Sequence, residues 1–99
     1  EAQYRTEAAF FSEALIAELR VADPATRATN YASPSGASFV AWKDKVTSGY
    51  GALPSSSVTA NLPTVAFSGT GNRTVLVTIK WQDPSGAIAR QFIVQTALE

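Results

Sequence analysis

The chain has 99 residues, 45% of them hydrophobic and 16% charged, and its eight basic and eight acidic side chains give a net charge of zero. This length fits one small globular domain with a thin core, and a neutral chain lacks the basic surplus that nucleic-acid or anionic-membrane binding requires. Because histidine and cysteine are both absent, the chain can form no disulfide and no zinc site of the usual kind.

Residues 1–22 are predicted to form one helix, because they lack Gly and Pro, are rich in Ala, Glu, Leu and Arg, and end before Asp23-Pro24. The helical pattern is already present at Glu1, without a preceding Met, which suggests a part of a longer protein. Apolar residues at steps of three and four form two stripes about 100° apart. The first stripe consists of Tyr4, Ala8, Phe11, Leu15, Leu19 and Ala22, and the second of Phe10, Ala14, Ala17 and Val21.

One sheet cannot cover both stripes of this helix. Either a loop covers the second stripe, or that stripe packs against a neighbouring subunit. Both alternatives stay open at this point, as does the question of which stripe meets the sheet. The residues expected to carry helix-to-sheet or subunit packing are Tyr4, Phe10, Phe11, Leu15, Leu19 and Val21.

The connecting region, residues 23–62, is predicted to be irregular apart from one short helix. Residues 23–37 are rich in Pro, Ser, Thr, Asn and Ala, which is typical of a loop. A helix is predicted over residues 39–48, with Ser38 as its N-cap. Its apolar face carries Phe39, Trp42 and Val46, and Gly49, Gly51 and Pro54 end it.

Residues 63–98 are predicted to form an antiparallel meander. The alternation of Val65 and Phe67 indicates a first strand, a turn follows at residues 69–72, and residues 74–81 alternate strictly. A type I turn is predicted at residues 83–86, and a last strand from about residue 87 to 98, with Ile88 on its packed face. The predicted sheet core consists of Val75, Val77, Ile79, Trp81, Phe92 and Val94.

This order predicts one α+β domain over residues 1–99, in which a long N-terminal helix packs on a sheet of three or four antiparallel strands. Its catalytic inventory is poor. A serine nucleophile would need one of three lysines as its base. A catalytic carboxylate pair is not indicated either, because Asp44 lies on the polar face of a helix and Asp83 starts a turn. We therefore expect no catalytic residue, no cofactor and no metal, and hence no enzyme.

Several runs resemble the PilV-type minor pilins of type IV pili. Residues 9–25 are similar to the family's helix, and Tyr31 follows it as the family's tyrosine does. Next come an aromatic segment like residues 39–42 and a Leu-Pro pair like residues 53–54. The "VxVxW" strand is matched by residues 75–81, and the closing strand by residues 92–98.

The resemblance implies a pilin-like fold and a structural role. In this family an apolar helix with an early Glu, here expected before Glu1, anchors the protein in the bacterial inner membrane, with the globular domain in the periplasm. A short basic leader with a processing site precedes this apolar helix in the family, and after assembly the helix would pack in the core of an extracellular pilus. The implied partners are other minor pilins and the major pilin, in a complex that primes assembly near the tip, in some systems with a large adhesin.

Two alternatives to a minor pilin stay open. A pseudopilin of type II secretion shares the helix-on-sheet organisation and differs in the filament that it serves. A small carbohydrate-binding module would use aromatic side chains on the sheet, and it requires Trp81 to be exposed.

Overall fold

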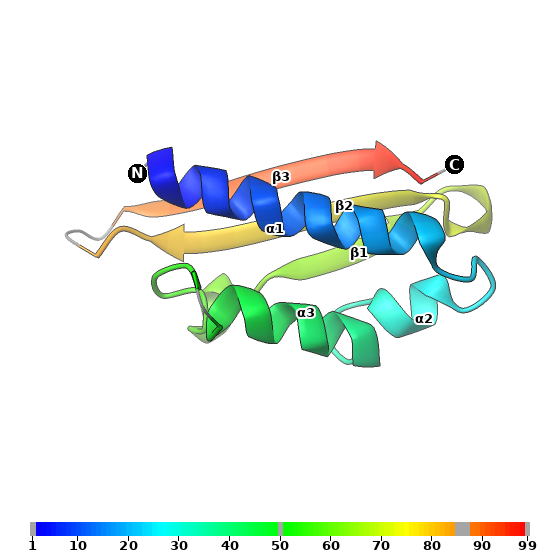
Figure 1. The fold of residues 1–99 in the computed structure, drawn as a ribbon, viewed down its shortest axis with the longest axis horizontal. Coiled ribbons are helices and arrows are strands. Elements are labelled where there is room, and N and C mark those ends of the chain that lie inside the picture. Colours follow the sequence, from blue (N-terminus) through cyan, green and yellow to red (C-terminus); the bar gives the residue numbers. More distant parts are fainter. Residues whose placement is uncertain (1, 50, 85–87, 99) are drawn as a thin grey trace.

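A long N-terminal helix lies across a three-stranded antiparallel sheet, with two shorter helices beside it (Figure 1). The structure is a computed structural model, and it describes residues 2–49, 51–84 and 88–98. This part of the chain is elongated, with extents of 43 × 21 × 21 Å. The helices and strands are α1 (Ala2–Val21), α2 (Arg27–Tyr31), α3 (Ala37–Thr47), β1 (Thr64–Ser68), β2 (Thr74–Gln82) and β3 (Ala89–Ala97). The predicted α+β order is therefore confirmed.

Helix α2 was not predicted, so the assignment of residues 23–37 as a loop is wrong in part. The Asp23 carboxylate accepts a hydrogen bond from the Ala25 backbone N–H at 3.0 Å, and its carbonyl accepts one from Arg27 at 2.9 Å. These bonds turn the chain directly after α1 into a new helical turn. A helix of five residues is too short to show an apolar period in the sequence.

Helix α3 has the predicted apolar face, because Phe39, Trp42 and Val46 are all buried. The predicted cap is wrong, since the helix begins at Ala37 and its N-cap is Gly36, with no side-chain cap hydrogen bond. Gly36 is required for space: a Cβ there would collide with the Asn30 carbonyl at the crossing of α2 and α3. Tertiary packing therefore decides where this helix starts.

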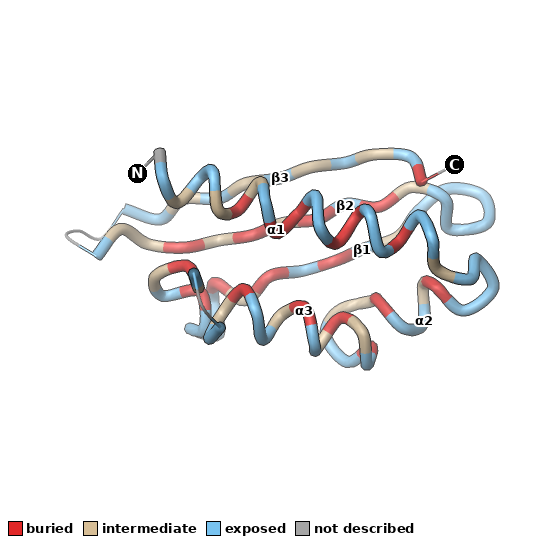
Figure 2. The backbone as a smooth tube through the Cα atoms, in the orientation of Figure 1, coloured by how far each residue is buried: buried red, intermediate tan, exposed pale blue. Residues whose placement is uncertain are grey.

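Strand β2 lies at the centre of the sheet and pairs with β1 and β3. In register, Val65 pairs with Val77, and Ile79 pairs with Phe92. Buried and partly exposed residues alternate along β2, whereas exposed and partly exposed residues alternate along β3 (Figure 2). The predicted packing of Ile88 is wrong, because it precedes β3 and is 58% exposed.

Two short 3-10 turns, η1 (Thr59–Asn61) and η2 (Thr70–Asn72), flank β1. The second forms the turn predicted at residues 69–72 between the first two strands. Gly69 and Gly71 have φ values of 79° and 69°, a region that favours glycine. The turn predicted at residues 83–86 lies partly outside the described residues.

Two buried serines of this fold differ in their hydrogen bonding. Ser12 on α1 is 1% exposed, and its hydroxyl has no hydrogen-bond partner among the described residues. Ser56 is fully buried, and its hydroxyl donates to the Leu53 carbonyl at 2.7 Å. A buried hydroxyl is costly when it is unpaired and stabilising when it is bonded.

The substitution Ser12→Ala is therefore expected to leave stability unchanged or to raise it by about 1 kcal/mol, because it removes an unpaired polar group. Ser56→Ala is the matched control and is expected to cost about 1 kcal/mol. Urea unfolding followed by circular dichroism measures both. Equal losses in the two variants would contradict the difference in bonding.

Candidate functional site

The two apolar stripes of α1 have opposite environments. Ala8, Leu15 and Leu19 of the first stripe are fully buried, and Phe11 is 7% exposed. Tyr4 and Ala22, at its two ends, are partly buried against the same core. The first stripe is therefore the face that packs on the sheet.

The second stripe, which we call the outer stripe, consists of Phe10, Ala14, Ala17 and Val21. Phe10 is 66% exposed and Val21 87% exposed, and the two alanines between them are also exposed. Phe10 and Val21 thus take no part in helix-to-sheet packing. Gly51, in the loop after α3, lines a pocket together with Phe10, but the described residues leave Phe10 and Val21 mostly exposed and so do not bury the outer stripe.

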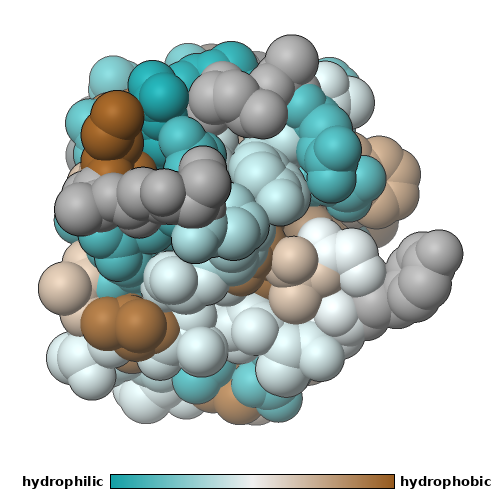
Figure 3. All heavy atoms as spheres, turned by 90° about the vertical axis from the view of Figure 1, so that its left-hand side faces the viewer, coloured by the Kyte–Doolittle hydropathy of each residue, from teal (hydrophilic) through white to brown (hydrophobic). Residues whose placement is uncertain are grey.

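At the end of the molecule where α1 begins, exposed hydrophobic surface is dispersed (Figure 3). Viewed from the end of the molecule where α1 begins, hydrophobic atoms form separate small areas among hydrophilic ones (Figure 3). Single exposed apolar side chains are ordinary on a protein surface, whereas an apolar row along one helix is not. The outer stripe is therefore the most distinctive surface feature of α1.

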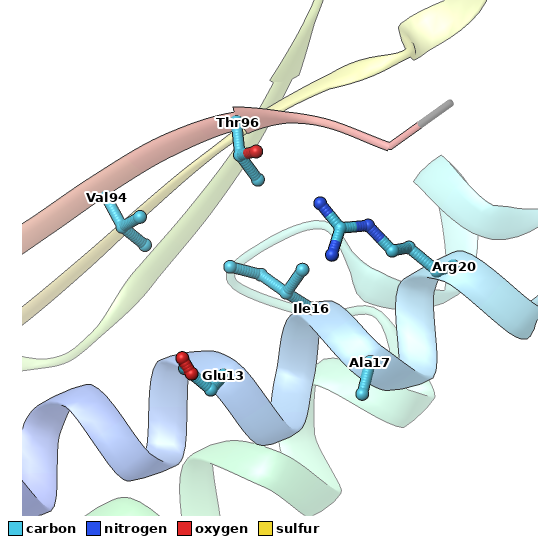
Figure 4. A pocket seen from close by; sticks show the side chains of 6 residues that line it. All are labelled: Glu13, Ile16, Ala17, Arg20, Val94 and Thr96. Carbon is cyan, nitrogen blue, oxygen red and sulfur yellow. The ribbon is translucent and has the colours of Figure 1, made fainter.

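A shallow groove of about 220 Å³ lies beside the outer stripe, between α1 and β3. Figure 4 shows Glu13, Ile16 and Arg20 on the helix side and Val94 and Thr96 on the strand side. Ile16, which belongs to neither stripe, is only 8% exposed and so extends the packed face toward β3. Ala17 belongs to both the groove and the outer stripe, which joins them into one surface.

Two arginines of α1 hold this surface against the edge of the sheet. The Arg5 guanidinium donates to the Gln91 carbonyl at 3.3 Å, and Arg20 donates to the Ala97 carbonyl at 3.2 Å. Both carbonyls belong to β3, which is an edge strand. The helix is therefore hydrogen-bonded to β3 near both of its ends, in addition to its buried packing on the sheet.

The predicted sheet core lies where the pattern placed it. Val75, Val77, Ile79 and Trp81 on β2 are fully buried, facing α1. Phe92 and Val94 on β3 are only partly buried, because β3 lies at the edge of the sheet. These six residues support α1 and are not themselves a surface site.

The residues considered for catalysis have structural environments. The Asp83 carboxylate forms an ion pair with the Arg90 guanidinium at 3.3 Å, and Asp44 is exposed on α3. Within the described ranges no cluster of three or more acidic side chains is placed to hold a metal ion. The geometry of these carboxylates indicates no particular reaction.

Both tryptophans are buried. Trp81 is fully buried and Trp42 is 3% exposed, and the Trp42 indole N–H donates to the Phe11 carbonyl at 3.0 Å. Neither ring is therefore available to stack on a sugar, and the condition set for the carbohydrate-binding alternative is not met.

Sequence reasoning missed two polar contacts that close the C-terminal end of α1. Arg27 is 2% exposed, and its guanidinium donates to the Leu19 carbonyl at 3.3 Å. The Tyr31 hydroxyl donates to the Glu18 carboxylate at 3.1 Å. Both partners come from the unpredicted helix α2, so the sequence carried no signal for either contact.

Burial, and then the hydrogen bond to Glu18 and its negative charge, raise the pKa of the Tyr31 hydroxyl above its usual value. A hydrogen bond with Ser38 acts in the opposite direction. A raised pKa in the folded state stabilises the fold fully below the pKa of the unfolded chain, about 10, and this stabilisation is lost as the pH rises through the folded pKa.

Tyr31→Phe is therefore expected to lower stability near pH 7 by about 1 kcal/mol and to reduce its fall above about pH 10. Urea unfolding of both proteins between pH 7 and pH 11 measures this, with Tyr4→Phe as the control. A wild-type stability that falls no more steeply than that of Tyr31→Phe would contradict the assignment.

Comparison with protein-family models, with curated proteins and with solved structures found no match to this chain. No helix among the described residues combines the length and the hydropathy needed to cross a membrane.

Proposed function

We propose that this chain is a structural assembly subunit of a type IV filament, similar to the PilV-type minor pilins, and not an enzyme. The observation that supports this most is the pair of stripes on α1: one is buried on the sheet, and the outer stripe is exposed. The sequence resemblance supplies the family, and the α+β order is compatible with it.

In this proposal, the sheet serves as a platform that presents α1 to neighbouring subunits. The outer stripe and the adjoining groove would bury Phe10, Ala17 and Val21 at a subunit contact. A buried phenylalanine contributes about 1.5–3 kcal/mol relative to an exposed one. The small alanines between the two larger residues let another helix approach closely, and Arg5 and Arg20 keep the platform rigid.

The proposal includes an apolar helical segment before Glu1, by which the protein is held in the inner membrane before assembly. It also includes the partners that the family implies, namely other minor pilins, the major pilin and in some systems a tip adhesin. The resulting location is the inner membrane with a periplasmic domain, followed by the extracellular pilus.

A pseudopilin of type II secretion is the alternative within the same structural class, and the same exposed stripe supports it. Deleting the gene separates the two. Loss of twitching and of DNA uptake would favour a pilus, whereas secreted proteins retained in the periplasm would favour a secretion filament.

The test of the class itself is the N-terminal sequence and mass of the full-length protein from the native cell envelope. We expect a processed start followed by about 20–25 apolar residues, one of them an early Glu, which is enough to span a bilayer. A native start at or near Glu1 would overturn the pilin proposal.

A further inference from the structure

A pocket between α3, the segment before β1 and strand β2 carries two lysines on otherwise mainly apolar walls. Its volume is about 360 Å³, within the range of small-molecule sites in proteins. Phe39 of α3 lines it together with Leu62 and Pro63, which lie between η1 and β1. Lys43 of α3 and Lys80 of β2 are the two charged residues in its lining.

Both lysines are partly buried, and neither side-chain ammonium has a hydrogen-bond or ion-pair partner among the described residues. No acidic side chain of the described residues lines the pocket. Asp44, next to Lys43 in the chain, is exposed and lies outside the lining. Two partly buried cations that line one pocket attract an anion, because a bound negative charge offsets the cost of their partial burial.

The apolar walls narrow the choice of anion. A free phosphate ion would leave the accessible apolar surface of Pro34, Ala60 and Leu62 uncovered, whereas an apolar group attached to the anion would bury it. The neighbouring hollow, which shares Lys80, is lined by polar residues such as Arg90, whose guanidinium already pairs with Asp83. The pocket lined by Lys43 and Lys80 therefore combines two ammonium groups that have no partner among the described residues with an apolar wall.

We propose that this pocket binds a small organic acid, with its apolar body against Pro34, Ala60 and Leu62 and its carboxylate at Lys43 and Lys80. The pocket includes no residue of α1. The proposal is therefore independent of the filament function, and the failure of one would leave the other standing.

Octanoate is the probe for the first experiment, because it carries one carboxylate on an unbranched apolar chain. Titration of the isotope-labelled 99-residue chain is followed by the NMR shifts of its backbone amides. We expect saturable shifts centred on Phe39, Lys43, Leu62 and Lys80. Acetate, which lacks the apolar body, and 1-octanol, which lacks the charge, should each bind at least about fivefold more weakly.

Charge-removing variants then test the lysines. Lys43→Gln and Lys80→Gln are each expected to weaken octanoate binding about threefold to tenfold, as loss of a charge-assisted contact predicts. Lys45→Gln is the matched control, since Lys45 is exposed on the same helix and lies outside the pocket. Because neither pocket lysine has a partner to lose, the spectra of the unliganded variants should show an intact fold.

Three results would overturn the proposal. One is equal binding of octanoate and 1-octanol, which would mean that the lysines recognise no charge. Another is an equal effect of Lys45→Gln and Lys43→Gln. The third is a set of shifts centred on Phe10 and Val21, which would show that octanoate binds the outer stripe of α1 instead.

Discussion

Replacement of Trp81 by Ala is expected to destabilise the domain by about 3–5 kcal/mol, the usual cost of truncating a fully buried tryptophan. Trp81 has no exposed surface, and the Arg5 guanidinium lies 5.6 Å from its ring centroid. The substitution removes the largest fully buried side chain under α1 and the cation–π contact with Arg5. Since domains of this size are stable by about 5–15 kcal/mol, a large share of stability would be lost.

Urea unfolding followed by far-ultraviolet circular dichroism measures the loss without depending on tryptophan emission. Leu76→Ala is the matched control, because Leu76 lies on the same strand but on the opposite face and is 37% exposed. It is expected to cost less than about 1 kcal/mol. Similar losses for the two variants would mean that the face of β2 assigned to the core is wrong.

Trp81→Phe is expected to cost less stability than Trp81→Ala and more than Leu76→Ala. The Trp81 indole N–H is buried without a hydrogen-bond partner among the described residues, so its removal offsets part of the cost of a smaller ring. A cost for Trp81→Phe well below that of Trp81→Ala would show that the ring, and not the N–H, stabilises the core.

Periodic patterns made most of the fold predictable. Strict alternation along β2 placed Val75, Val77 and Ile79 correctly, because a central strand with one covered face has a clear period of two. The helical spacing of apolar residues, sustained over about twenty positions, predicted the bounds of α1 to within one residue. Where a face is buried over many residues, the sequence must carry that period.

What could not be predicted depends on contacts between distant segments. Gly36 is the N-cap of α3 because the chain passes close to the Asn30 carbonyl there, and no local residue preference encodes that contact. Arg27 is buried because it reaches the open carbonyl of Leu19 at the end of α1, although arginine in a polar segment predicts exposure. Local residue preferences alone favoured Ser38 as the cap of α3 and an exposed Arg27.

The candidate surface was predictable only as a choice between two stripes. Both stripes have helical spacing, and the sequence does not say which one meets the sheet. The structure separates them because Leu15 and Leu19 are larger than the alanines at the corresponding places of the outer stripe and fill the space above β2. Pairing of Arg5 and Arg20 with β3 then fixes the rotation of the helix about its axis.

The double substitution Phe10→Ser with Val21→Ser is expected to reduce surface filaments at least about tenfold without unfolding the domain. Both side chains are mostly exposed in the isolated chain, so their removal costs it little, within about 1 kcal/mol. In a filament they would be buried, and losing both would remove several kcal/mol from each subunit contact.

The measurement combines immunoblots of sheared filaments and of the periplasm with a twitching assay in cells that express the full-length protein. Ile93→Ser is the matched control, because Ile93 is 51% exposed but lies on the far face of β3. Normal amounts of folded double variant together with few filaments would support assembly through the outer stripe. Normal filaments in the double variant would show that the subunit contact lies elsewhere. An equal loss of filaments in Ile93→Ser would also contradict the prediction, because removal of any exposed hydrophobic side chain would then explain the effect as well as the outer stripe does.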